Sequence, residues 1–155
     1  MKRGGIAFAL AATLVAFSVR AGAADPARLV GAVLSPLELT DAFVATLPLD
    51  EIDLSFETGH GVESGHYRGV RLWTLVEKAG LAPLPGKNAD LTRVLLVTGR
   101  DGYRVALALA EIEPNYENKA VLLVKDGEGW RLLVPGDRHG GRSVRDVAQI
   151  ELRSP

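Results

Sequence analysis

A short segment near the C-terminal end of the chain, residues 137–145, concentrates the side chains and glycines best suited to hold an anion. Its adjacent glycines, Gly140 and Gly141, allow successive backbone N–H groups to converge on one point. Arg142 follows them with a planar guanidinium that matches a phosphate or the edge of a heterocyclic ring. The segment therefore predicts an anion or heterocycle site between two strands, against the simpler alternative of a solvated hairpin connection with surface arginines. Its candidate contacts are Asp137, Arg138, His139, Gly140, Gly141, Arg142 and Arg145.

The three histidines of the sequence are His60, His66 and His139. Three imidazoles are a chemically reasonable zinc site, but no two of these lie one helical turn apart along the sequence. We therefore expect exposed histidines rather than metal ligands. Hydrogen bonding from His60 and His139 to the phosphate or ring nitrogens of a ligand is the alternative role.

Aromatic residues near this segment have two possible uses. Trp130 begins a strand just before residues 137–145, which we call the arginine segment. Its ring could stack on a heterocycle there or cover the edge of the core. Trp73 lies on a helix next to an apolar stripe and is expected to pack. Tyr103 shares its strand face with Val105 and Leu107, which predicts a buried ring with a hydrogen-bonded hydroxyl.

Three acidic residues, Asp101, Asp137 and Asp146, lie nearest to the predicted site in sequence or motif order. A carboxylate can accept two hydrogen bonds from the amino and N–H groups of a heterocyclic ring, so one of them could bind such a ring. Turn formation alone also explains Asp101. The sequence has no Ser-His-Asp order, paired-carboxylate spacing or phosphate-binding loop, so nothing independent indicates a hydrolase.

The first residues have the features of an export signal. Lys2 and Arg3 form a basic start, residues 6–19 are almost wholly apolar, and Ala21-Gly22-Ala23 is a small-residue cleavage pattern. The apolar run falls short of the roughly 20 residues that span a bilayer, although an uncleaved anchor is the alternative. We therefore predict a signal peptide over residues 1–23, one domain over residues 24–155 and a periplasmic location.

Composition limits the partners of the mature domain. The 18 basic and 19 acidic residues nearly balance, so the charge gives no basic face of the kind that nucleic acid needs. A domain of about 130 residues has room for its own core. The absence of cysteine excludes disulfides, so the core must hold the fold without covalent links.

The periodicity of the mature chain predicts many short strands and few short helices, which favours an α+β or mostly-β domain over a parallel doubly wound fold. Thr40 is a candidate N-cap for the first helix, and Gly80 a C-terminal stop for the second. Residues 58–66 are glycine-rich and predict a surface loop. The expected strands cover residues 28–34, 52–56, 93–98, 103–107, 120–124 and 131–134, and the expected helical segments 41–46, 72–79 and 110–112.

Several short motifs stand in a fixed order along the chain. They are the Tyr67-to-Leu72 step into a leucine-rich helix ending at Ala79-Gly80, the Asp101-Gly102-Tyr103 turn, the strand ending Val134-Pro135-Gly136, the Gly140-to-Arg145 turn, and the final Ile150-Glu151-Leu152. This order closely resembles the sulfite-oxidase-type molybdopterin-binding domain of oxidoreductases, over about residues 34–152. The resemblance implies the mixed, barrel-like α+β fold of that domain, in a short form, with a pterin or molybdopterin-like ligand.

The chain departs from that family at two places. In the family, a cysteine thiolate ligates molybdenum, and a soft thiolate suits that bond. The loop after Phe56, where the family places the cysteine, reads Glu57-Thr58-Gly59-His60 here. A His-Gly-x-Pro-like step is replaced by Glu128-Gly129-Trp130. We therefore expect no catalytically competent molybdenum.

Two classes of function follow from the resemblance. The first is an exported, non-catalytic pterin- or molybdopterin-binding protein, similar to periplasmic pterin-binding proteins that relay the state of their ligand to a membrane-bound receptor. The second is a molybdopterin-dependent oxidoreductase, or a subunit of one with a redox partner, in which the cofactor and solvent or an oxygen or nitrogen side chain hold the metal. A ligand-free interaction module is the third possibility. The missing thiol favours the first.

Overall fold

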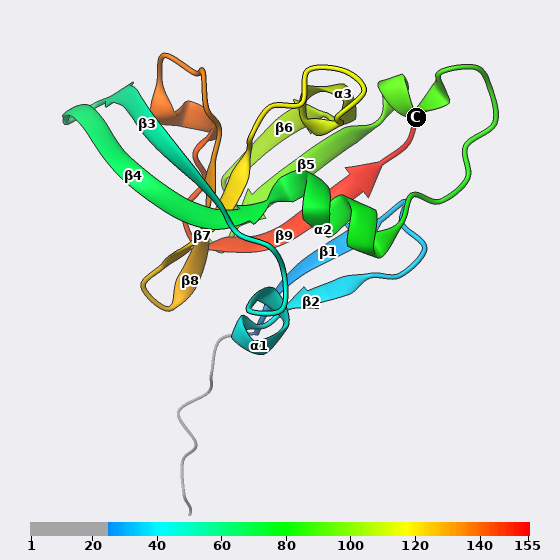
Figure 1. Cartoon of the computed structure of the whole chain (residues 1–155), viewed down its shortest axis with the longest axis horizontal. Helices are drawn as coiled ribbons and strands as arrows, with labels where there is room; N and C mark the ends of the chain where they lie inside the picture. The colour runs from blue at the N-terminus through cyan, green and yellow to red at the C-terminus, as the bar shows by residue number, and fades with distance from the viewer. Residues whose placement is uncertain (1–24) are drawn as a thin grey trace, which may run out of the picture.

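Two β-sheets and a few short helices make up the computed structural model, which describes residues 25–155 (Figure 1). The predicted signal peptide lies outside these residues. In chain order the elements are β1 (Ala27–Gly31), β2 (Leu37–Leu39), α1 (Asp41–Val44), β3 (Asp50–Thr58), β4 (Gly61–Arg71), α2 (Leu72–Ala79), the 3-10 turn η1 (Ala89–Thr92), β5 (Val94–Gly99), β6 (Arg104–Ala108), α3 (Leu109–Ile112), β7 (Leu122–Asp126), β8 (Gly129–Leu133), the 3-10 turn η2 (Gly140–Arg142) and β9 (Val147–Arg153).

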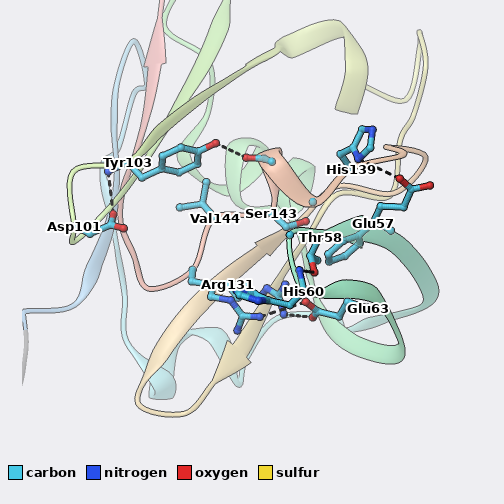
Figure 2. A pocket seen from close by; sticks show the side chains of 15 residues that line it. Glu57, Thr58, His60, Glu63, Asp101, Tyr103, Arg131, His139, Ser143 and Val144 are labelled. Carbon is cyan, nitrogen blue, oxygen red and sulfur yellow. Dashed lines mark hydrogen bonds and ion pairs between the residues drawn. The ribbon is translucent and has the colours of Figure 1, made fainter.

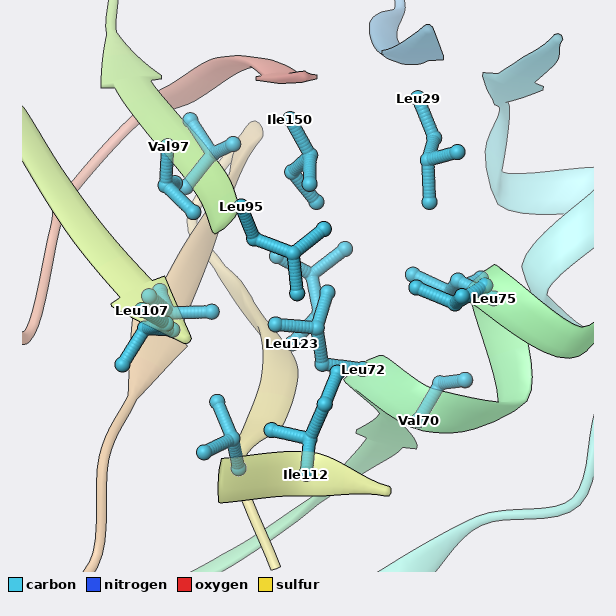
Figure 3. Close-up of a cluster of buried hydrophobic side chains, with 14 of the residues drawn as sticks. Leu29, Val70, Leu72, Leu75, Leu95, Val97, Leu107, Ile112, Leu123 and Ile150 are labelled. Atoms are coloured by element: carbon cyan, nitrogen blue, oxygen red, sulfur yellow. The ribbon is translucent and has the colours of Figure 1, made fainter. Parts of the chain in front are cut away.

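The larger sheet has five strands in the order β2-β1-β9-β5-β6. Its central strand, β9, pairs in parallel with β1 and antiparallel with β5. One face of this sheet is apolar because Leu29, Leu95 and Ile150 point to the same side and are fully buried. These residues form the main core together with the buried side of α2 (Figure 3).

Helix α2 buries the stripe that its sequence predicts. Leu72, Leu75, Val76 and Ala79 are all buried, as expected for apolar residues that recur at helical spacing. Gly80 ends the helix with a positive φ of 69°, a backbone conformation that favours glycine. The aromatic-x-Gly-Val step before the helix is the last part of strand β4.

The smaller sheet has four strands in the order β3-β4-β7-β8. Its long hairpin corrects the prediction of a glycine-rich loop over residues 58–66. Strand β4 begins at Gly61 and pairs with β3 along its whole length, and the turn is closed by a hydrogen bond of 2.8 Å from Thr58 Oγ1 to the Gly61 carbonyl. The glycines of β4 are there for packing: a side chain at Gly69 would overlap the Leu123 carbonyl on β7.

A second, smaller core cluster lies beneath this hairpin. It consists of the buried residues Leu54, Phe56, Leu122, Val124 and Leu133. Leu54 and Phe56 alternate with exposed polar residues along β3, which confirms the predicted half-buried strand. The hairpin is therefore anchored at its base by apolar packing, while its tip extends over the arginine segment.

Most of the remaining elements follow the sequence predictions within a few residues, but β2 and η1 lie where the sequence predicted no strand or helix. Thr40 caps α1 and its hydroxyl accepts a hydrogen bond of 3.1 Å from the Phe43 N–H. Gly102, with a φ of 83°, lies in the turn between β5 and β6. The fold class is confirmed as α+β, with two sheets and few short helices. Within residues 25–155, no helix combines the length and apolarity needed to cross a membrane.

Candidate ligand-binding site

A cavity of about 650 Å³ lies between the tip of the β3-β4 hairpin and the arginine segment. Figure 2 shows these side chains, which come from strands of the smaller sheet and from the β3-β4, β5-β6 and β8-β9 connections. The volume falls in the range of small-molecule sites, roughly 300 to 1,000 Å³. The lining residues are Phe56, Glu57, Thr58, Gly59, His60, Glu63, Asp101, Tyr103, Arg131, His139, Gly140, Gly141, Ser143, Val144 and Arg145.

The base of the cavity holds a two-pronged ion pair. Arg131 Nη1 donates to Glu63 Oε1 at 2.6 Å, and Arg131 Nη2 donates to Glu63 Oε2 at 3.2 Å. The Arg131 side chain is only 7% exposed, and its guanidinium lies 5.8 Å from the centre of the Phe56 ring. Its Nε is buried without a hydrogen-bond partner among the described residues. A charged group is thus fixed in the wall by one carboxylate and one aromatic ring.

Glu63 also contacts two further groups. Arg145 Nη2 donates to Glu63 Oε2 at 3.3 Å, and the Tyr67 hydroxyl donates to Glu63 Oε1 at 3.2 Å. The hydrogen bond from Arg131 is the main cause that lowers the pKa of Glu63 below its ordinary value, against an opposing effect of burial. Burial, together with the Glu63 charge, raises the pKa of Tyr67. Glu63 is therefore a carboxylate, and Tyr67 a neutral phenol, at neutral pH.

The arginine segment is fastened to the edge of β3. The Glu57 N–H donates to the Arg138 carbonyl at 2.8 Å, and the Glu57 carboxylate pairs with Arg138 at 3.3 Å and His139 at 3.6 Å. Gly140 lies against the Phe56 ring, where an added Cβ would come within 2.6 Å of ring carbons. The absence of a side chain at Gly140 allows this close packing, which sets the width of the cavity.

Tyr103 forms part of the rim. Its hydroxyl donates to the Gly141 carbonyl at 2.7 Å, and its N–H donates to Asp101 Oδ1 at 2.9 Å. The predicted hydroxyl contact is confirmed, but the predicted burial is wrong because Tyr103 is 51% exposed. Tyr103 lies just before β6, outside the part of the core that Val105 and Leu107 fill. An exposed aromatic face is thereby available beside the cavity.

The sequence-predicted site residues divide into two groups. His60, His139, Gly140, Gly141 and Arg145 line the cavity. Arg138 lies outside the lining, with an 80% exposed side chain paired to Glu57. The other three predicted residues, Asp137, Arg142 and Trp130, also lie outside the lining.

Arg142 does not offer a vacant guanidinium, which corrects the expectation of a ligand-facing fork. Its Nη2 and Nε donate to the two carboxylate oxygens of Asp137 at 2.6 and 2.8 Å, and its Nη1 donates to Glu111 at 2.9 Å. The hydrogen bonds from Arg142 are the main cause that lowers the pKa of Asp137. Burial raises the pKa of Glu111, but hydrogen bonds from Arg142 and Lys119 outweigh it and lower the pKa overall. Arg142 thus ties the arginine segment to α3.

Trp130 packs in the main core and is only 8% exposed. Its indole N–H donates to the Leu39 carbonyl at 3.0 Å, and Lys125 Nζ lies 4.8 Å from its ring centre. Of the two uses considered for Trp130, the structure shows core packing. Trp73 is half-buried against the same core, as expected.

Within residues 25–155, no group of three or more histidine and acidic side chains could hold a metal ion. His66 lies on β4 and pairs with Asp53 at 2.9 Å and Glu51 at 3.4 Å, and it does not line the cavity. The sequence has no cysteine. The donor set therefore does not fit a molybdenum ion held by a protein thiolate.

The same lining offers hydrogen-bond acceptors, hydrogen-bond donors and an aromatic face. Acceptor oxygens of Glu57 and Asp101, guanidinium donors of Arg145 and the exposed ring of Tyr103 surround one space. A heterocycle with donor and acceptor edges and two π-faces can use each of these groups.

Sequence reasoning missed several lining residues, above all Arg131 and Glu63. They lie far apart in the chain and meet only because β4 and β8 belong to one sheet. One signal was present: Arg131 is a charged residue within the apolar run of residues 130–134. A charge in a buried strand needs a partner, so a carboxylate from another strand was to be expected.

No family model matches the sequence, and no curated protein sequence matches it. Among solved structures, the sulfane dehydrogenase SoxCD from Paracoccus pantotrophus matches with a TM-score of 0.67 and 18% sequence identity. The match covers 84% of this chain but only 38% of the SoxCD chain. At this identity the likeness shows the fold alone, and it confirms the sulfite-oxidase-like fold that the order of motifs predicted.

Proposed function

We propose that this chain is a non-catalytic binding protein for a pterin-like heterocycle, which it holds in the cavity between the β3-β4 hairpin and the arginine segment. The observation that carries the proposal is the lining itself. Two guanidinium groups, three carboxylates and an exposed aromatic ring converge on about 650 Å³ in a sulfite-oxidase-like fold whose sequence lacks cysteine.

The edges and the faces of a pterin ring both have complementary groups in this cavity. Asp101 and Glu57 offer carboxylate oxygens to the amino and N–H groups of the pyrimidine edge. Arg145 pairs with Glu63 and Asp126, but its side chain is 60% exposed, and the N–H groups that these pairs leave over can donate to the ring carbonyl. Tyr103 offers a stacking surface, and its ring is held in place by the hydrogen bond to Gly141. Preorganised contacts of this kind reduce the entropy lost on binding.

The same lining supports a catalytic function less well than it supports a binding function. Molybdopterin chemistry depends on a protein that positions the cofactor, and this chain has no thiolate to hold the metal. The alternative, a molybdopterin-dependent oxidoreductase or a subunit of one, draws support from the fold likeness to SoxCD. It requires the cofactor and solvent, or an oxygen or nitrogen side chain, to supply every ligand of the metal.

The proposal extends to location and partner. With an export signal at its start, the protein would meet its ligand in the periplasm and relay the bound state to a membrane-bound receptor. Hydrogen bonds connect the arginine segment to both β3 and α3. Ligand contacts at Arg145 or Gly141 would therefore act on a segment that is connected to the surface, and this supports a relay.

Native mass spectrometry with metal analysis of the purified protein separates the alternatives. We expect an organic ligand of pterin mass, or none, and less than stoichiometric molybdenum. Stoichiometric molybdenum together with oxo-transfer turnover would establish the oxidoreductase instead.

Calorimetric titration with oxidised and reduced pterins tests the cavity directly. Removing a charge-assisted hydrogen bond costs about 1.5 to 3 kcal/mol, so Arg145→Ala should weaken binding roughly ten- to a hundredfold. Arg153→Ala is the control, because Arg153 has an exposed side chain that pairs with Glu151 on β9, away from the cavity. Equal affinities for the wild type and Arg145→Ala, or no binding of any pterin, would remove this cavity as a pterin site.

A further inference from the structure

We propose that Glu63 acts as an internal anion, which fills the guanidinium fork of Arg131 and so restricts the cavity to pterins that carry no phosphate group. The inference rests on the proposed function and names the class of pterin. It also identifies Glu63 as the residue that determines this specificity.

The geometry of the base of the cavity supports this role. Both carboxylate oxygens of Glu63 face the two terminal nitrogens of Arg131, at 2.6 and 3.2 Å. This is the arrangement in which a guanidinium otherwise grips two oxygens of a phosphate. Arg131 is nearly inaccessible, at 7% exposure, whereas Glu63 is 28% exposed at the cavity surface. A ligand entering the cavity therefore meets the carboxylate of Glu63 before it meets Arg131.

The second cation of the lining is also engaged. Arg145 donates to Glu63 at 3.3 Å and to Asp126 at 3.1 Å. Around the cavity, the two positive side chains, Arg131 and Arg145, face three negative ones, Glu57, Glu63 and Asp101. With neutral histidines the lining has one net negative charge. A phosphate dianion would thus enter a site whose guanidinium groups, among the described lining residues, are already paired.

Nearby arginines outside the lining do not change this balance. Arg142 is held by Asp137 and Glu111, and Arg138 pairs with Glu57. For a phosphate to reach Arg131, Glu63 would have to give up its two hydrogen bonds to Arg131 and keep only the contacts with Arg145 at 3.3 Å and Tyr67 at 3.2 Å, which is unfavourable for a partly buried carboxylate. A neutral heterocycle needs no such exchange. The site therefore discriminates by repulsion as well as by attraction.

Calorimetric titration with 7,8-dihydroneopterin, its monophosphate ester and inorganic phosphate tests the inference on the intact protein. The wild type should bind dihydroneopterin at least tenfold more tightly than the ester and should not bind inorganic phosphate. Glu63→Gln keeps the size of the side chain and removes its charge. It should bind the ester at least tenfold more tightly than the wild type does, and should gain binding of inorganic phosphate.

Glu151→Gln is the matched control, because it removes the same charge from a carboxylate that, like Glu63, is 28% exposed and pairs with an arginine, but that lies outside the cavity lining. Its preference between the two pterins should stay within about threefold of the wild-type value, since the change lies outside the cavity and exposed pairs contribute little. Glu63→Gln/Arg131→Gln should lose the gained phosphate binding.

The outcomes are separable. If the wild type bound the ester as tightly as dihydroneopterin, the role of Glu63 would be overturned. This measurement uses the wild-type protein alone, so it does not depend on the folding of any variant. Glu63→Gln that folds, by thermal unfolding, but gains neither ester nor inorganic phosphate would overturn it too. If no protein binds any pterin, the proposed function fails. Phosphate binding by Glu63→Gln alone would then still establish Glu63 as the internal anion.

Discussion

Arg142 holds two carboxylates of its own chain, and this gives it a structural rather than a ligand-binding role. Truncation to alanine leaves Asp137 and Glu111, each about 20% exposed, without their shared partner. We predict that Arg142→Ala lowers the free energy of unfolding by about 1–3 kcal/mol, the cost of unpaired buried polar groups. Urea unfolding measures the change. Arg138→Ala, at an 80% exposed side chain, should change stability by less than about 1 kcal/mol, and a similar loss in both variants would contradict the role given to Arg142.

The same ion pairs predict a loss of stability in acid. The hydrogen bonds from Arg142 lower the pKa of Asp137 from its ordinary 3.8, and those from Arg142 and Lys119 lower the pKa of Glu111 from 4.5 despite its burial. Carboxylates whose pKa is lower in the folded state stabilise it above the unfolded-state pKa, and this contribution is lost as the pH falls through the folded-state pKa. The free energy of unfolding should therefore begin to fall near pH 4.5 and continue to fall below pH 3.8. Urea unfolding across this range should show a shallower decline for Arg142→Ala, and parallel curves would contradict the prediction.

Residue types near the site could be predicted from the sequence, but their partners could not. Of the candidate residues within 137–145, His139, Gly140, Gly141 and Arg145 line the cavity, and their role as ligand contacts stays a prediction. Which guanidinium stays available depends on carboxylates brought in by other elements. Glu111 comes from α3 and Glu63 from β4, and no local pattern around Arg142 or Arg131 contains that information.

Among the elements, the 3-10 turn η2 depends on a close approach to β3. An alanine Cβ at Gly140 would lie 2.6 Å from carbons of the Phe56 ring, whereas at Gly141 the nearest atom is the Tyr103 hydroxyl at 4.0 Å. We predict that Gly140→Ala displaces η2, costs about 1–3 kcal/mol of stability and weakens pterin binding. Thermal unfolding and calorimetry measure both effects.

Gly141→Ala is the control for that experiment. It adds the same methyl group one residue later, in open space, and should leave stability and binding close to wild type. If Gly141→Ala were as damaging as Gly140→Ala, backbone freedom rather than contact with Phe56 would explain the glycines.

Most elements could be predicted from the sequence because their local patterns agree with their burial. The alternation at β3, the stripe of α2 and the capping of α1 by Thr40 are examples. The prediction of a loop over residues 58–66, at the tip of the β3-β4 hairpin, was wrong because it rested on the glycines in this segment. Gly65 and Gly69 are instead strand positions where the Tyr67 ring and the Leu123 carbonyl leave no room for a side chain, and such crowding arises only after the strands have paired.

For the molecule as a whole, export is the property that the sequence predicts and residues 25–155 cannot show. We predict that the protein is recovered from the periplasm, without detergent, with an N-terminus near Ala24. N-terminal sequencing of the fractionated protein measures this. Leu14→Arg, which places a charge in the apolar run, should keep full-length protein in the cytoplasm. Full-length wild-type protein in the membrane fraction would contradict cleavage and support an anchor.

The fold of the whole domain was predictable because several weak motifs occur in one order. No single turn or strand identified it, and no family model matches. The likeness to SoxCD, at 18% identity, confirms the fold that this order predicted. The function is less predictable, since it depends on a few lining residues of that fold.

The position of β9 in the larger sheet has a consequence for how the chain acquires its structure. The strand that lies between β1 and β5 follows all the other described strands in the sequence, and Arg28 pairs with Gln149 across nearly the whole described chain. Pairings so distant in sequence slow folding. A nascent chain that ends before β9 can form local hairpins such as β3-β4 and β7-β8, but it leaves β1 and β5 without the neighbour they share. Cooperative folding of this domain must therefore wait until β9 has left the ribosome, and until then the apolar faces of β1 and β5 are exposed to chaperones and proteases.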